Sequence, residues 1–358
     1  GYTYTGMLDF AGPFQTAIRD WTGLGFREYY FPEIRSMGGA ITILSLVLYP
    51  YVYLLARATF LEQSIGVMEV SRTLNCGAWT IFRRVALPLA RPGIVAGLSL
   101  ALMEALADYG TVAYFGIGVF TTGIFRTWFG LGDYNAAAKM SAFLLLFVFV
   151  LIILERISRK KAQYHNSSEK LTRFSEYQLN GLKAFGSFAT CSIPVLFGFL
   201  LPGCQLTIWA LETWNYMIDV RFFELVRNSF LLGFVAALIS VIVALFLGYG
   251  KRIIPGKITI FSIRTASIGY AIPGTVIAIG VIIPLAWVDG RINVFMESNY
   301  GITSGLIFSG TIVAVMFAYV VRFLAISLQA VESGLGKIKP TMDFAARSLG
   351  CRPRENLF

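Results

Sequence analysis

Charged side chains are scarce in this chain of 358 residues. Asp, Glu, Lys and Arg make up 14% of the sequence, whereas they make up about a quarter of a typical soluble domain. Hydrophobic residues account for 56%, and the mean hydropathy is +0.67. This composition argues against a soluble multidomain protein, because such a protein would have to bury several entirely apolar helices at once.

Histidine and cysteine are also rare. The one histidine, His165, lies among polar residues, and Cys76, Cys191, Cys204 and Cys351 are far apart. This spacing predicts neither a disulfide framework nor a CxxC metal site. We see no constellation of nucleophile, general base and metal ligands, so we expect neither catalytic residues nor a metal site in this chain.

Long apolar runs dominate what is present. A helix needs about 20 apolar residues to cross a bilayer, and uncharged runs of that length recur along the sequence. With a shorter run at 140–154, and one at 93–103 if Glu104 is tolerated next to it, they predict an all-α integral membrane protein with about seven transmembrane helices. The clear runs are 36–56, 184–211, 228–250, 265–288 and 298–321.

The net charge of +10 does not indicate a nucleic-acid partner, because the cations are concentrated in alternate loops. Lys and Arg gather at 156–183, at 251–264 and in two motif regions, while the loops between them are balanced or acidic. Cationic loops prefer the cytoplasm, and this rule gives strictly alternating crossings. We therefore expect the lipid bilayer as a partner, residues 1–35 outside the cytoplasm, and residues 156–183 as a cytoplasmic linker.

Two cationic stretches about 275 positions apart resemble each other. The first contains Glu69-Val70-Ser71, then Asn75, then Val85-Ala86-Leu87-Pro88, and the second contains Phe344-Ala345-Ala346-Arg347-Ser348-Leu349-Gly350. The first resembles the signature loop of permease subunits of binding-protein-dependent ABC importers, E-A-A, three residues, G, nine residues, I-x-L-P. Val70, Ser71 and Asn75 depart from that pattern, and Asn tolerates the left-handed backbone that glycine would adopt there. In the second, Phe344 replaces the acidic residue.

The resemblance implies two six-helix permease modules in one polypeptide. Residues 36–155 would be the C-terminal part of the first module, and 184–358 the N-terminal part of the second, ending within its docking loop. About three helices would then precede residue 1 and two would follow residue 358. The residues implied in docking to a separate ATPase are Glu69, Val70, Ser71, Arg72, Leu74, Asn75, Val85, Leu87, Pro88, Phe344, Ala345, Ala346, Arg347, Leu349 and Gly350.

A narrower resemblance is to the fused, two-module permeases of ferric-iron importers, carried by stretches at 31–36, 48–57, 106–116 and 120–126. It implies a bacterial inner-membrane transporter that receives ferric iron from an extracytoplasmic binding protein. The implied ATP-binding partner is a homodimer that uses ATP and Mg, and this chain would bind no cofactor and hydrolyse no ATP. Permeases for phosphonates, thiamine or polyamines share the docking loop and stay open as alternatives, as does an ion-coupled secondary transporter. A membrane-embedded enzyme finds no support.

Two features inside the apolar runs are candidates for the translocation path. Glu104 and Asp108 are one helical turn apart, so we expect both on one helix face with Tyr109 beside them. Their oxygens suit a hard cation, although a structural pair is an equally good interpretation. Ile272-Pro273-Gly274 and Gly280 interrupt another run and predict either a hinge or, more often, close helix packing.

Overall fold

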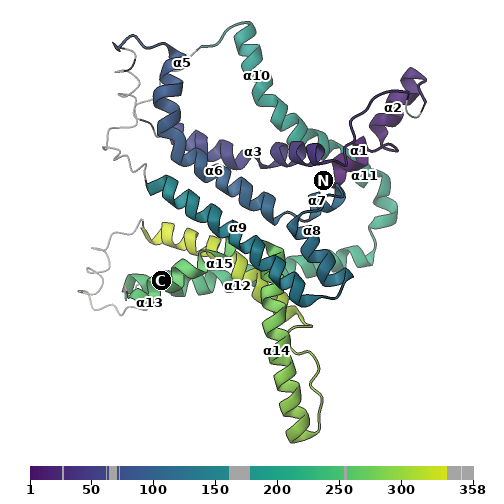
Figure 1. Cartoon of the computed structure of the whole chain (residues 1–358), viewed down its shortest axis with the longest axis vertical. Coiled ribbons are helices and arrows are strands. Elements are labelled where there is room, and N and C mark those ends of the chain that lie inside the picture. The colour runs from purple at the N-terminus through teal and green to yellow at the C-terminus, as the bar shows by residue number, and fades with distance from the viewer. Residues whose placement is uncertain are drawn as a thin grey trace. The chain divides into compact units, whose positions relative to one another are not determined.

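The computed structural model describes residues 1–25, 28–61, 63, 71, 73–160, 178–253, 256–336 and 348 (Figure 1). Every regular element in these ranges is a helix, which confirms the predicted all-α class. Seven segments in the described part are long and apolar enough to cross a membrane, as predicted. They are α3 (Met37–Leu61); α5 (Ala78–Ile81) with η1 (Phe82–Ala86) and α6 (Leu87–Ala107); α9 (Tyr134–Lys160); α10 (Leu182–Val195) with η3 (Leu196–Leu200) and α11 (Leu201–Met217); α12 (Val220–Ile253); α14 (Gly274–Tyr300); and α15 (Ile312–Gly336).

Several helix ends differ from those that the apolar runs predict. The crossing that contains the run at 93–103 ends at Ala107, and the one predicted at 265–288 is broken into α13 (Lys257–Ala266), the 3₁₀ turn η4 (Gly269–Ala271) and α14. Pro273 is the N-cap of α14, where its missing N–H does no harm. The last crossing is predicted at 298–321. In the structure it begins later, at Ile312, and ends later, at Gly336.

The chain forms two compact units. The first contains residues 1–132 and 146–215, and the second contains residues 133–145 and 216–358. These units follow contacts in space, so they do not test the boundary between two permease modules, which stays a prediction. The shorter helices of the first unit are α1 (Tyr2–Leu8), α2 (Pro13–Thr22), α7 (Gly110–Tyr114), α8 (Phe120–Phe125) and the π-helical turn η2 (Arg126–Gly130).

In the first unit, α3 and α6 lie side by side along much of their length (Figure 1). Two glycines on α6, four positions apart, make this possible. A Cβ atom at Gly97 would lie 2.7 Å from Val52 Cα, and one at Gly93 would lie 2.9 Å from the Leu55 carbonyl oxygen. Small residues at this spacing let two membrane helices approach backbone to backbone. The segment between these two helices carries the first motif.

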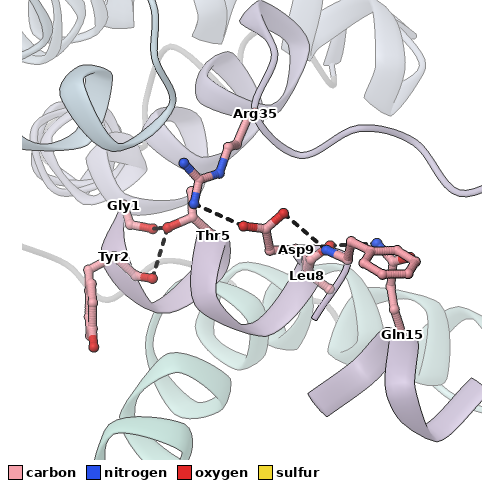
Figure 2. A network of polar contacts seen from close by, with 8 residues as sticks. Gly1, Tyr2, Thr5, Leu8, Asp9, Gln15 and Arg35 are labelled. Atoms are coloured by element: carbon pink, nitrogen blue, oxygen red, sulfur yellow. Dashed lines mark hydrogen bonds and ion pairs between the residues drawn. The ribbon is translucent and has the colours of Figure 1, made fainter. Parts of the chain in front are cut away.

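The described part of residues 1–35 contains α1 and α2 and packs against the start of α3. Arg35 Nη2 lies 2.9 Å from Asp9 Oδ2, and the buried Gln15 donates from Nε2 to the Leu8 carbonyl at 2.9 Å (Figure 2). Tyr4 is buried with Ala40, Ile43 and Phe115, and its hydroxyl donates to the Phe197 carbonyl. Burial raises the pKa of the Tyr4 phenol.

In the second unit, α12 and α15 pack together (Figure 1). Ala236, Ser240, Ala244 and Gly248 recur at every fourth position of α12, and all are buried. A Cβ atom at Gly248 would lie 2.8 Å from Val331 Cγ1. Both helices therefore end in the same place, in agreement with the prediction that both cross in the same direction.

The pair α14 and α15 is held together by a polar anchor. Asp289 on α14 is 1% exposed, and its carboxylate accepts hydrogen bonds from Phe308 N at 2.9 Å, Ser309 N at 2.8 Å and Ser309 Oγ at 2.7 Å. Asn293 Oδ1 accepts from Ser304 N at 2.9 Å. Two α14 side chains thus fix the connection to α15. The buried carboxylate of Asp289 is fully hydrogen-bonded, which makes a charge tolerable inside this helix pair.

Candidate functional site

The first motif loop contains a helix-ending turn at Asn75. Asn75 has φ 59°, which confirms the predicted left-handed conformation, and it is the one non-glycine residue with positive φ in the described ranges. Cys76 N donates to the Ser71 carbonyl at 3.2 Å. This bond across six residues, with a left-handed residue just before its donor, is the Schellman helix end. Asn75 therefore replaces the motif glycine without changing the turn.

The side chains around this turn form an exposed apolar surface. Leu74 is 72% exposed and Trp79 is 68% exposed. Trp79 stacks on Phe82, with ring centroids 5.5 Å apart, and Phe82 in turn stacks on Phe60 at the end of α3 at 6.3 Å. Ser71, in contrast, is buried. The turn thus presents two large apolar side chains, of which Trp79 is held by stacking on Phe82.

The second part of the motif lies where the loop re-enters the membrane helix. Val85 is in the π-helical turn η1, and Leu87 and Pro88 begin α6. Gln63 Nε2 donates to the Ala86 carbonyl at 2.8 Å, which ties this turn to the chain just after α3. Val85 is half-buried, whereas Leu87 and Pro88 are exposed, and so are the neighbouring cations Arg83 and Arg84. Most of the predicted docking residues that the structure describes are therefore exposed, whereas Ser71 is buried.

The other predicted docking residues lie outside the described residues. They are Glu69, Val70 and Arg72 in the first copy and Phe344, Ala345, Ala346, Arg347, Leu349 and Gly350 in the second. What the structure does place is the helix leading to the second copy. Lys251 at the end of α12 forms an ion pair with Glu332 at 2.5 Å, and Arg252 Nη1 donates to the Leu335 carbonyl at 2.8 Å. The end of α15 thus lies beside cations of α12.

The candidate path residues lie at the other end of α6. Glu104 is half-buried in the last turns of the helix. The expectation that Asp108 shares its helix face is wrong, because α6 ends at Ala107 and Asp108 is already extended, with φ −67° and ψ 127°. Its Oδ2 accepts a hydrogen bond from Val112 N at 3.0 Å, and the Tyr109 ring lies 4.5 Å from that of Phe125. Asp108 therefore stabilises the start of α7.

The glycines in the interrupted run differ from one another. A Cβ atom at Gly274 would lie 2.6 Å from Arg322 Nη1, so Gly274 does allow a close approach. At Gly280 a Cβ would meet no atom within 4 Å, so the packing interpretation is wrong for Gly280. Sequence reasoning also missed Arg322 itself. It directly follows an apolar run, and only the late start of α15 reveals that it lies inside a crossing.

Comparisons with known proteins agree with the motif. Residues 34–163 match the family described as "Binding-protein-dependent transport system inner membrane component". The chain is 24% identical over 340 residues to the Fe(3+)-transport system permease protein FbpB 2 of Haemophilus influenzae, covering 93% of this chain and 62% of that protein. It is 24% identical over 307 residues to the ferric transport system permease protein FbpB of Actinobacillus pleuropneumoniae, covering 79% and 42%.

A third relative matches only locally. The molybdenum transport system permease protein ModB of Haemophilus influenzae is 30% identical over 98 residues, covering 27% of this chain and 40% of that protein. No solved structure matches the chain. The chain thus spans less than two thirds of the length of each of these relatives. Residues 34–163 thus match that family of inner membrane components, and over most of its length this multi-pass membrane chain is similar to ferric transport permeases.

Proposed function

We propose that this chain is the membrane-spanning permease subunit of an ATP-driven importer for ferric iron. In this proposal an extracytoplasmic binding protein delivers the iron, and a homodimeric ATPase on the cytoplasmic side drives its passage. The similarity to two ferric permeases over most of the chain supports the choice of cargo. ATP and Mg belong to the ATPase subunits, and this chain contributes the path and the docking loops.

The observation that carries the proposal is the exposed turn at the end of the α3–α6 pair. Leu74 and Trp79 present apolar surface next to the cations Arg83 and Arg84, a composition suited to a groove on another protein. Because Gly97 brings the two helices into backbone contact, movement of the turn displaces α3 and α6 as one body. A partner that closes on the turn would therefore move two membrane helices together.

The second docking loop and the path belong to the same proposal. The motif at 344–350 would receive the second ATPase subunit, as the motif at 69–88 receives the first. Glu104, Asp108 and Tyr109 would line the path, since all three are half-buried near the end of α6 away from the docking turn. Oxygen groups there could pass a hard cation along without holding it tightly.

Reconstitution tests the proposed function directly. The full-length protein is placed in liposomes with its ATPase inside and its binding protein outside, and uptake of radioactive ferric iron is measured. We expect uptake that requires ATP and both partners. Uptake driven by an ion gradient without the ATPase would instead identify a secondary transporter and contradict the proposal.

Substitution of the exposed turn tests docking separately. We expect Leu74→Asp to abolish copurification of the ATPase while the thermal unfolding of the permease stays unchanged, because the side chain is 72% exposed. The matched control is Leu131→Asp, at a leucine that is 73% exposed and outside both motif copies. Equal loss of the ATPase in both variants would show that the turn is not the docking site.

A further inference from the structure

A groove lies between the first halves of α14 and α15, within the second unit. Its volume is about 430 Å³, and most of its wall is apolar, with Ile277 and Val281 on one side and Ala314 and Ala318 on the other. Arg322 is the one ionisable group in that wall that carries a permanent charge. An arginine that opens onto an apolar groove inside a membrane crossing requires an explanation, because such residues are costly there and usually functional.

Arg322 lies near the middle of the 25-residue helix α15. Its Nε atom is buried and has no hydrogen-bond partner, and the guanidinium forms no ion pair with any carboxylate in the described ranges. A guanidinium cannot lose its proton to avoid this cost. The charge and the unused donors are therefore available to an anion that enters the groove.

The N-terminus of α14 adds a second positive feature at the same place. Gly274 begins this 27-residue helix, and the position of its missing Cβ lies 2.6 Å from Arg322 Nη1. Helix N-termini carry a partial positive charge and bind anions. Gly274 and Arg322 both line the groove. In many transporters the substrate site is formed by such an interrupted helix, whose half-helix N-termini point to anionic groups.

We propose that the α14–α15 groove binds an oxyanion, with Arg322 and the first turn of α14 as its two contacts. This inference rests on the proposed function and extends it to the chemical form of the cargo. Ferric iron is a hard cation that takes oxygen ligands. An arginine repels the bare ion but attracts a phosphate- or carboxylate-bearing complex of it, so iron passes this groove together with an anionic oxygen ligand.

Equilibrium binding of radioactive inorganic phosphate to the full-length permease in phosphatidylcholine nanodiscs tests the site without any transport step. We expect saturable binding that falls about tenfold or more in Arg322→Gln, because charge-assisted hydrogen bonds to phosphate are among the strongest in proteins. Arg322→Lys should retain part of the affinity. The control Arg264→Gln, at an exposed arginine of α13, should bind phosphate as the unaltered protein does.

Two further measurements keep the test independent of folding. Gly274→Ala keeps the charge but places a methyl group against Nη1, so it should also weaken phosphate binding severalfold. Phosphate should raise the unfolding temperature of the unaltered protein and not that of Arg322→Gln, because a ligand stabilises only the state that binds it. A lower unfolding temperature for Arg322→Gln without phosphate would reveal a structural partner for the arginine and overturn the proposal.

The remaining outcomes are equally decisive. Absence of phosphate binding by the unaltered protein, or equal binding by Arg322→Gln, overturns the oxyanion site. Displacement of phosphate by phosphatidylglycerol in the nanodisc would identify a lipid headgroup as the ligand and overturn the assignment to cargo. Iron uptake is assayed separately, so loss of iron transport with intact phosphate binding would count against the proposed function alone.

Discussion

Two helix pairs in this chain are built on opposite plans. The α3–α6 pair is closed by Gly93 and Gly97, and its backbones touch. The α14–α15 pair is fastened at one end by Asp289 and encloses a groove of about 430 Å³ farther along. A helix pair with no room between its members can transmit movement along its length. A helix pair that encloses a groove can instead bind a solute. Under the proposed function, this difference assigns coupling to the ATPase and contact with the cargo to different helices.

The largest expected effect comes from filling the closed pair. In Gly97→Leu the new side chain would begin 2.7 Å from Val52 Cα, so the helices must separate. We expect a loss of about 3 kcal/mol in the free energy of unfolding, the upper range for overpacking, together with loss of iron uptake. Gly280→Leu is the matched control on α14, because a Cβ there meets no atom within 4 Å. If both variants were equally destabilised when unfolded in detergent, the α3–α6 pair would not be more tightly packed than the surroundings of Gly280.

The next effect concerns the fastening of the open pair. Asp289→Ala leaves Phe308 N, Ser309 N and Ser309 Oγ without their acceptor. Such a loss costs about 1–3 kcal/mol, and we expect faster proteolysis of the 301–311 connection with α3–α6 unaffected. Asn293→Ala is the control, because its side chain serves only Ser304 in the described structure. Unchanged proteolysis in Asp289→Ala would mean that other contacts hold α14 and α15 together.

A smaller effect is expected at the turn that the closed pair supports. Asn75→Val forces a β-branched residue into φ 59°, at a cost of about 2 kcal/mol. We expect weaker copurification of the ATPase with a normal membrane fold. Asn75→Gly restores the residue typical of the motif and should bind the ATPase as well as, or better than, the unaltered chain. The turn would be irrelevant to docking if both variants behaved alike.

The smallest effect distinguishes the two interpretations of Asp108. Asparagine can also accept the hydrogen bond from Val112 N, so Asp108→Asn should change stability by less than about 0.5 kcal/mol, whereas Asp108→Ala should cost about 1 kcal/mol. Iron uptake then reports on the charge alone. Reduced uptake in Asp108→Asn supports a path role, and unchanged uptake leaves only the structural one.

The sequence predicts the features that depend on local chemistry. Apolar runs identify all seven crossings in the described ranges, five of them at the length that a bilayer requires and two from shorter runs. The left-handed turn at Asn75 follows from the tolerance of asparagine for that conformation. Neither prediction requires knowledge of which helices touch.

The features that sequence reasoning missed depend on contacts between distant residues. Asp108 ends α6 because its carboxylate stabilises the start of α7, and no helical period reports this. Asp289 is a charge within a crossing, and it is tolerated there because Phe308 and Ser309 donate to it. Arg322 directly follows the apolar run at 298–321, which predicts that it lies outside the crossing. The helix in the structure begins only at Ile312, so Arg322 lies inside it.

The paired ends of α12 and α15 have a mechanical consequence. Lys251 and Arg252 attach the last turn of one helix to Glu332 and Leu335 near the end of the other. A force applied to the end of α15 is therefore shared with α12. Two helices joined in this way resist tilting better than one helix would, so under the proposed function a force from the ATPase would reach the groove through both.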